Sequence, residues 1–223
     1  PQVSLNDSDG KFITWLEENR LDERHPYYPY RDSHSTPEFG KIPAVDGQML
    51  DYMIIKPVDF DPQKRYPVVL APYGGPHGHS VTKSWAAGWH QVLAGEGYVV
   101  FVMDNRGSDH RGKAFEDVLY RQMGEVEIID QMAGVEHLKQ LPYVDPEKIG
   151  IFGWSYGGYM ALMARFKNPE LIRAAVAVAP VTQWELYDTF YTERYLDRPQ
   201  DNPEGYLASS VFPYIEQQTN PLL

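Results

Sequence analysis

Short, continuous runs of apolar residues recur along the chain from about residue 40 onwards. Such runs are typical of strands that are buried on both faces of a sheet. They lie at 67–71, 98–103, 149–152 and 174–179. One more strand is predicted at 49–55, after the Asp46-Gly47 turn, and we expect it to be antiparallel to its neighbours.

Between these runs the apolar residues are spaced as they are on helices. A stripe at three- and four-residue intervals predicts a helix around 125–141. Two further helices are predicted over 85–93 and 161–166. Strands that alternate with helices predict an α/β fold, in which helices cover both faces of a mostly parallel central sheet.

The first 38 residues have a different pattern. Apolar segments at 3–5 and 12–16 flank the turn-forming residues 6–10, and together they predict a β-hairpin. A lone hairpin is marginally stable in water, so we expect it to belong to a larger sheet. Residues 20–38 are polar and aromatic, and we interpret them as a crossing segment. The boundary is therefore placed between 1–38 and 39–223.

The most informative motif is Gly153-Trp154-Ser155-Tyr156-Gly157, between the predicted strand at 149–152 and the predicted helix at 161–166. A Gly-x-Ser-x-Gly motif in this context indicates a nucleophile elbow, a tight turn that lifts the serine hydroxyl clear of the sheet. The alternative is an ordinary glycine-rich turn between a strand and a helix. We favour the elbow because both flanking elements are predicted.

A serine nucleophile needs a histidine base, an acid that orients the base, and donors for the oxyanion. In the α/β-hydrolase order, the acid and the histidine follow the serine in sequence. All seven histidines of this chain precede Ser155. Either the order is unusual, or the chain lacks part of its active site.

Two loops follow the carboxyl ends of predicted strands, where open α/β sheets bind their ligands. Tyr73 lies in the first, and its phenol can donate to an oxyanion beside the backbone N–H of Tyr156. A packed turn residue is an equal alternative for Tyr73. Arg106 lies in the second loop, which we interpret as structural, with the arginine holding the elbow region.

Aromatic residues follow the predicted strand at 174–179. At helical spacing, Trp184, Tyr187 and Tyr191 would share one face of a helix. Such a stripe is usually part of a core. Because it comes directly after a strand that borders the elbow, it could equally form the wall of a substrate pocket.

No metal site is predicted. His77 and His79 are close in sequence, but no carboxylate or third histidine has a suitable spacing, so we interpret them as solvated loop residues. The chain contains no cysteine, which excludes disulfides and thiolate ligands.

Composition narrows the function classes. The 223 residues are enough for one α/β domain, and 23% charged with 43% hydrophobic residues is ordinary for a globular protein. A net charge of −11 argues against binding to nucleic acids or to anionic membranes. No apolar run is long enough to span a bilayer.

These motifs resemble those of the dipeptidyl peptidase IV branch of the prolyl oligopeptidase family of serine peptidases. The resemblance rests on residues 153–159, 178–181, 184–185, 187–188 and 191–195, with Tyr73, Gly75-Pro76 and Arg106-Gly107-Ser108. It implies that residues 39–223 form an α/β-hydrolase catalytic domain. Residues 1–38 would then be the last strands of a β-propeller and the crossover that follows it.

The resemblance also implies roles for individual residues. Ser155 would be the nucleophile, and Tyr73 with the amide of Tyr156 would form the oxyanion hole. The pocket for a proline ring or an alanine side chain would be lined by Tyr156, Val181, Trp184, Tyr187 and Tyr191. A flat aromatic pocket suits the compact pyrrolidine ring.

The chain departs from the family pattern at both ends. Family members carry a propeller whose paired glutamates hold the substrate's free amine, and an acid and a histidine beyond the position of Leu223. We therefore expect a catalytic domain truncated at the C-terminus, inactive by itself, with an open sheet edge and an uncovered apolar surface.

The complete enzyme implied by the resemblance is a cofactor-free serine exopeptidase that removes Xaa-Pro or Xaa-Ala dipeptides from peptide N-termini. Two alternatives stay open: another serine acyl hydrolase, such as an acyl-peptide hydrolase or an esterase, and a non-catalytic interaction module with the same fold. A homodimer is one possibility. The lack of cysteine favours a soluble bacterial protein of the periplasm or the cytoplasm.

Overall fold

The computed structural model describes residues 2–85, 88–217 and 221–223. By its internal contacts this part of the chain divides into two compact units, Pro1–His34 and Ser35–Leu223. The first unit contains the predicted hairpin, in which strand β1 (Val3–Asn6) pairs antiparallel with strand β2 (Phe12–Glu17).

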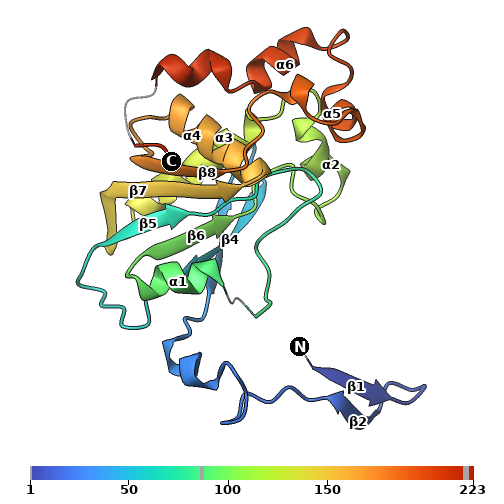
Figure 1. Ribbon diagram of the computed structural model, residues 1–223, viewed down its shortest axis with the longest axis vertical. Coiled ribbons are helices and arrows are strands. Elements are labelled where there is room, and N and C mark those ends of the chain that lie inside the picture. Colours follow the sequence, from blue (N-terminus) through green and yellow to red (C-terminus); the bar gives the residue numbers. More distant parts are fainter. Residues whose placement is uncertain (1, 86–87, 218–220) are drawn as a thin grey trace. The chain divides into compact units, whose positions relative to one another are not determined.

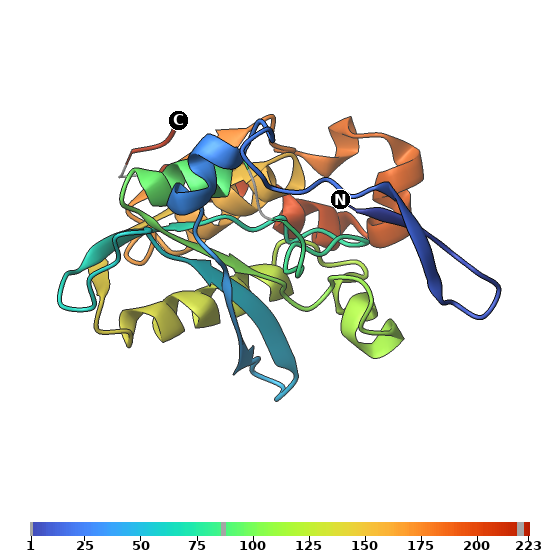
Figure 2. The same ribbon diagram turned by 90° about the horizontal axis from the view of Figure 1, so that it is seen from below.

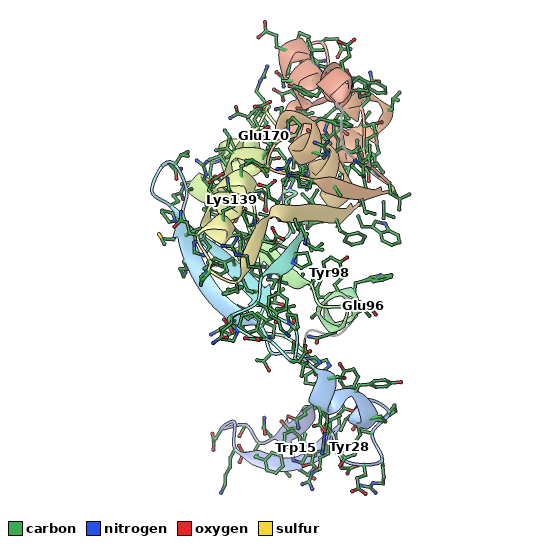
Figure 3. All side chains as sticks on the ribbon, turned by 90° about the vertical axis from the view of Figure 1, so that its left-hand side faces the viewer. Trp15, Tyr28, Glu96, Tyr98, Lys139 and Glu170 are labelled. Carbon is green, nitrogen blue, oxygen red and sulfur yellow. The ribbon has the colours of Figure 1, made fainter. Side chains whose placement is uncertain are left out.

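The hairpin of the first unit is closed by a hydrogen-bonded turn. The carboxylate of Asp7 accepts hydrogen bonds from the backbone N–H groups of Asp9 and Lys11, at 3.0 and 2.8 Å. A short 3-10 helix, η1 (Tyr28–Ser33), ends this unit, which also contains Trp15 and Tyr28 (Figure 3). Every residue of β2 is exposed, so the hairpin has no core of its own.

Within the described residues, six strands of the second unit form one sheet in the order β3-β4-β6-β5-β7-β8 (Figure 1). Strand β4 pairs antiparallel with both β3 and β6, and the pairs from β6 through β5 and β7 to β8 are parallel. The bounds are β3 (Glu38–Pro43), β4 (Met49–Ile55), β5 (Tyr66–Leu70), β6 (Val99–Met103), β7 (Val144–Trp154) and β8 (Ala174–Val178). Each predicted apolar run is confirmed as a strand of this sheet.

Helices cover both faces of the sheet (Figure 1 and Figure 2). Helix α1 (Trp89–Gly95) packs with Val100 and Val102 of β6 on one face. Helices α3 (Val126–Lys139) and α4 (Tyr156–Lys167) pack on the other face, where Phe101 belongs to the larger core. The alternate residues of β6 thus enter two different cores, which explains why its sequence is apolar at every position.

The predicted helices are present with shifted bounds. The helix expected over 85–93 is α1, which begins at Trp89, and residues 86–87 lie outside the described part of the chain. The helix expected at 161–166 begins earlier, at Tyr156. The remaining elements are short: α2 (Lys113–Glu116), η2 (Asp117–Leu119), η3 (Trp184–Leu186), α5 (Thr189–Leu196), α6 (Pro203–Ser209) and η4 (Phe212–Gln217).

The loop after β6 contains a buried ion pair. Two guanidinium nitrogens of Arg106 donate to the carboxylate of Asp130 on α3, at 2.9 and 2.7 Å, and a third donates to Asp46 at 2.9 Å. A buried guanidinium requires such partners, since an unpaired charge would be costly. The prediction that Arg106 holds the elbow region is therefore wrong: the arginine ties α3 to the turn between β3 and β4.

An apolar surface lies uncovered beside α1. A hollow of about 530 Å³ is lined by side chains from β5, β7 and β8 together with Trp89 and Leu93 of α1. Beyond β8, Leu222 pairs in parallel with Ala175, and the N–H of Leu223 donates to the Ala175 carbonyl at 3.0 Å.

Among the described residues, none of the helices combines the length and the apolar character that a membrane span requires.

Candidate active site

Ser155 occupies the sharp turn between β7 and α4. Its backbone has φ 58° and ψ −119°, which is a strained conformation for a residue with a side chain. The N–H of Ser155 donates to the carbonyl of Val178 on β8 at 2.9 Å, and this hydrogen bond fixes the turn against the neighbouring strand. Ser155 is exposed at the carboxyl end of its strand, as a nucleophile elbow requires.

The glycines of the motif allow the helix to approach two other segments closely. A Cβ atom on Gly157 would lie 2.5 Å from the carbonyl oxygen of Pro72, and one on Gly158 would lie 2.8 Å from the carbonyl oxygen of Val178. Neither position can hold a larger residue without moving backbone. The sequence motif is therefore an elbow and not an ordinary turn.

Tyr73 lies directly against this elbow. A Cβ atom on Gly157 would be 3.5 Å from the Tyr73 Cα, which places the loop after β5 beside the start of α4. The Tyr73 ring is half-buried, with its centroid 6.0 Å from that of Tyr156. Burial, and then the neighbouring phenols of Tyr187 and Tyr195, raise the pKa of Tyr73. A phenol is protonated at neutral pH even without this shift, so Tyr73 can donate a hydrogen bond there.

Tyr156 contributes its backbone and its side chain in different ways. It is the first residue of α4, so its N–H has no partner within the helix and is available at the positive end of the helix dipole. Its side chain is buried, with the residue only 2% exposed, and its hydroxyl donates to Oε1 of Glu127 at 2.6 Å.

Glu127 is a buried acid that the sequence analysis missed. Its carboxylate also accepts the N–H of Gly124, at 2.9 Å, and none of its surface is exposed. Burial raises the pKa of Glu127 from 4.5 to about 6, although its hydrogen bonds act in the opposite direction. The signal in the sequence was weak, because a charged residue in the first turn of a helix is normally solvated.

We expect Glu127→Ala to lower the free energy of unfolding by roughly 2–4 kcal/mol, because it leaves the Tyr156 hydroxyl and the Gly124 N–H unpaired in the core. The folded-state pKa of Glu127 lies above its usual value, so its contribution to stability decreases as the pH rises from about 4.5 to 6. Urea denaturation should therefore show a larger loss at pH 5 than at pH 8.

The matched control is Glu136→Ala, an exposed glutamate on the same helix. It should change the free energy of unfolding by less than about 0.5 kcal/mol. Equal losses for the two variants would mean that the contact between Glu127 and Tyr156 does not stabilise the elbow.

The aromatic residues after β8 form a cluster that reaches Tyr156. The centroid of the Trp184 ring lies 5.5 Å from that of Tyr156 and 5.9 Å from that of Tyr191, with which it is stacked. The Tyr187 centroid lies 5.7 Å from that of Tyr191. Trp184 is 1% exposed and Tyr187 is 45% exposed, so the cluster runs from the core to the surface. Val181 is partly buried and packs against the same core.

The expectation that these rings share one helix is wrong. Trp184 lies in η3, Tyr187 follows it in extended backbone, and Tyr191 lies in α5. The carboxylate of Asp188 caps α5 by accepting the N–H of Tyr191 at 2.8 Å. The rings meet because the chain turns between the two helical segments, and the helical spacing in the sequence is coincidental.

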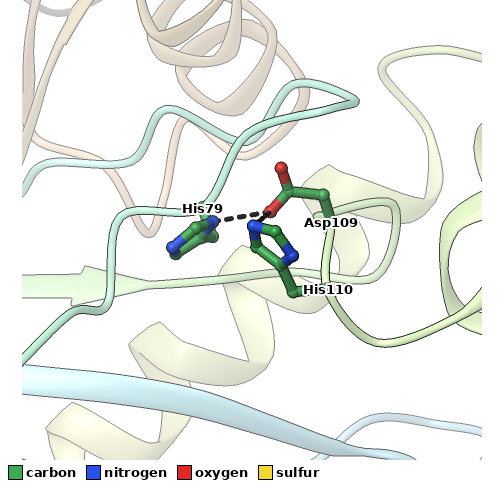
Figure 4. A group of neighbouring side chains, drawn as sticks. All are labelled: His79, Asp109 and His110. Atoms are coloured by element: carbon green, nitrogen blue, oxygen red, sulfur yellow. Dashed lines mark hydrogen bonds and ion pairs between the residues drawn. The ribbon is translucent and has the colours of Figure 1, made fainter. Parts of the chain in front are cut away.

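Within the described residues, no side chain is hydrogen-bonded to the Ser155 hydroxyl. His77 and His79 are exposed loop residues, as expected, but the fold brings a carboxylate and a third histidine close to His79. Nδ1 of His79 lies 2.6 Å from Oδ1 of Asp109, and His110 lies beside them (Figure 4). His77 remains exposed, and its ring packs against Tyr195.

Residues 85–223 match the model of the prolyl oligopeptidase family, which is more than half of the chain. The chain belongs to the prolyl oligopeptidase family. The relatives described below place it in the dipeptidyl peptidase IV-like branch of that family.

Two sequence relatives illustrate this. The chain is 44% identical over 182 residues to dipeptidyl peptidase 8 of Mus musculus, a match that covers 80% of this chain and 20% of that protein. It is 37% identical over 175 residues to a probable dipeptidyl peptidase 4 of Aspergillus flavus, covering 77% and 23%. The chain therefore spans about a fifth of the length of these curated relatives.

Two solved structures have the same fold. A putative dipeptidyl aminopeptidase IV of Bacteroides ovatus superposes with a TM-score of 0.92 at 41% identity, covering 99% of this chain and 31% of that one. Dipeptidyl peptidase 4 of Porphyromonas gingivalis superposes with a TM-score of 0.91 at 38% identity, with the same coverage. The second unit thus has the α/β-hydrolase fold of this prolyl oligopeptidase branch.

Proposed function

We propose that the full-length protein is a serine exopeptidase that releases dipeptides with proline or alanine at the second position from peptide N-termini. The observation that supports this most is the juxtaposition of three features: the strained elbow at Ser155, the Tyr73 loop packed against Gly157, and the aromatic cluster that reaches Tyr156. Its membership of the dipeptidyl peptidase IV-like branch supports the same substrate class.

In the proposed reaction, the Ser155 hydroxyl attacks the carbonyl carbon of the scissile peptide bond and gives its proton to a histidine base. The oxyanion accepts hydrogen bonds from the Tyr73 phenol and the Tyr156 N–H. The carbon–nitrogen bond then breaks, and the leaving amine takes the proton. Water hydrolyses the resulting ester on Ser155 and releases the dipeptide.

The aromatic cluster would hold the second residue of the substrate. Trp184 and Tyr156 are buried, Tyr191 is half-buried and Tyr187 is exposed, while Val181 packs against the same core. Flat rings at this spacing offer contact to a five-membered pyrrolidine ring along its faces. A glycine at the same position would lose that contact.

We further propose that the base and the acid are residues beyond Leu223, so that residues 1–223 alone do not hydrolyse peptides. In support, all seven histidines precede Ser155 in the sequence, and within the described residues none is hydrogen-bonded to its hydroxyl. The oxyanion donors by themselves would give only the residual catalysis that remains when triad members are removed.

A substrate panel tests the proposed specificity on the full-length protein. We expect kcat/KM for a chromogenic amide of an Xaa-Pro dipeptide to exceed that for the Xaa-Gly analogue by at least about tenfold, because the ring fills the aromatic pocket. An N-acetylated Xaa-Pro amide and a simple acyl ester of similar size complete the panel. Preference for the ester would indicate an esterase, and preference for the acetylated peptide an acyl-peptide hydrolase.

A further inference from the structure

Two histidines and an aspartate meet on the loops that follow β5 and β6 (Figure 4). Nδ1 of His79 lies 2.6 Å from Oδ1 of Asp109, and Nε2 of His110 lies 3.7 Å from the same oxygen. One ligand atom from each residue lies within 4.8 Å of the other two. We propose that His79, Asp109 and His110 bind a divalent transition-metal ion of the zinc type.

The donor atoms favour this class of ion. Two imidazole nitrogens and one carboxylate oxygen are ligands that Zn²⁺ and similar ions prefer, whereas Mg²⁺ and Ca²⁺ prefer oxygen alone. With metal–ligand bonds of about 2.0–2.1 Å, the donors of a tetrahedral site are about 3.3 Å apart. The two separations that involve Asp109, 2.6 and 3.7 Å, lie on either side of this value, and all three donor atoms lie within 4.8 Å of one another, so side-chain rotations are needed to complete the site. The fourth position is left for water.

The backbone around the cluster is already fixed. The carboxylate of Asp104 accepts the N–H groups of Ser80 and Val81, at 2.7 and 3.0 Å. The N–H of Asp109 donates to the carbonyl of Gly78 at 3.4 Å. Hydrogen bonds therefore join the two loops next to the ligands. This reduces the conformational entropy that the loops lose when an ion binds.

A simpler interpretation is that the hydrogen bond between His79 and Asp109 joins the two loops and nothing else. That interpretation does not explain His110. Its backbone has φ 64°, its side chain is 74% exposed, and its ring nevertheless lies edge-on to His79 with centroids 4.7 Å apart. His110 is thus a third donor that left-handed backbone holds next to His79. This favours a binding site over a hydrogen bond that only joins the two loops.

The site also adjoins Tyr73. A Cβ atom on Gly78 would lie 2.7 Å from Cε1 of the Tyr73 ring, so the residue before His79 packs directly on that ring. A bound ion would therefore restrict the motion of the loop that carries Tyr73. Metal binding itself does not depend on the proposed peptidase function.

The test is calorimetric titration of the untagged protein with Zn²⁺ in a buffer that does not bind metals, with Co²⁺ absorption as a second readout of coordination geometry. The variants are His79→Ala and His110→Asn. The matched control is His77→Asn, because His77 and His110 are both exposed loop histidines with left-handed backbone, φ 56° and 64°. Asparagine tolerates that conformation, so both substitutions should fold.

We expect one Zn²⁺ per chain, and an affinity that falls by at least about tenfold in His79→Ala and in His110→Asn. The control His77→Asn should bind like the unmodified protein, and Co²⁺ should give a tetrahedral absorption spectrum that the two variants lose. Absence of saturable Zn²⁺ binding would overturn the proposal. So would binding of equal strength in all variants, which would place the ion elsewhere on the protein.

Discussion

Ser155→Ala in the full-length protein should lower kcat for an Xaa-Pro amide by about 10⁴–10⁶-fold. The elbow presents this hydroxyl at the surface in a strained backbone conformation, and the covalent route has no substitute once the oxygen is removed. Substrate binding should survive, because the aromatic cluster is unchanged. The measurement is steady-state kinetics together with binding of a non-hydrolysable Xaa-Pro analogue.

The control for this variant is Ser84→Ala, an exposed loop serine whose hydroxyl contacts only Thr82 among its described partners. Its kcat should equal that of the unmodified protein. Retained turnover in Ser155→Ala would remove Ser155 as the nucleophile, and the proposed mechanism with it.

Tyr73→Phe should lower kcat by about 10²–10³-fold, equivalent to roughly 3–4 kcal/mol of transition-state stabilisation, with KM little changed. The phenol is half-buried against the elbow and is protonated at neutral pH, so it can act as a donor. Phenylalanine keeps the ring and its packing against Gly78 and removes only the hydroxyl.

Tyr98→Phe is the matched control for Tyr73→Phe. Tyr98 (labelled in Figure 3) comes directly before β6, whereas Ser155 follows β7, and the parallel pairing of β6, β5 and β7 places the two residues at opposite ends of the strands. It should leave both kinetic constants unchanged. If Tyr73→Phe instead raises KM and leaves kcat as it was, Tyr73 is a binding residue and the oxyanion has another donor.

The strands and the elbow were predictable from the sequence because their signals are local. The residues of β6 are buried on both faces, and this requires an apolar side chain at every position. At the elbow, a Cβ atom on Gly153 would lie 1.9 Å from the carbonyl oxygen of Gly157, four residues further along the chain. Such constraints act on adjacent residues, so they appear as a motif.

The features that the sequence did not show depend on contacts between distant segments. Glu127 looks like a solvated residue of a first helical turn, and only the packing of α3 against α4 places it beneath Tyr156. His79 and Asp109 are 30 residues apart and meet because β5 and β6 are parallel neighbours. Their spacing along the chain carries no metal-site pattern, so tertiary structure alone brings them together.

The aromatic cluster forms in a different way from the one that the sequence predicted. Trp184, Tyr187 and Tyr191 do gather, but the chain bends between η3 and α5 instead of continuing as one helix. The Asp188 cap that begins α5 was visible in the sequence as an aspartate three residues before Tyr191. It would have indicated the break.

The central claim, that Ser155 is an activated nucleophile in the full-length protein, is tested most directly by fluorophosphonate labelling followed by peptide mapping. The account predicts a single adduct on Ser155, formed rapidly in the full-length protein and far more slowly in residues 1–223 alone. An adduct on another serine would contradict the assignment of the nucleophile. Equally rapid labelling of the 223-residue chain would show that a base is already present within it.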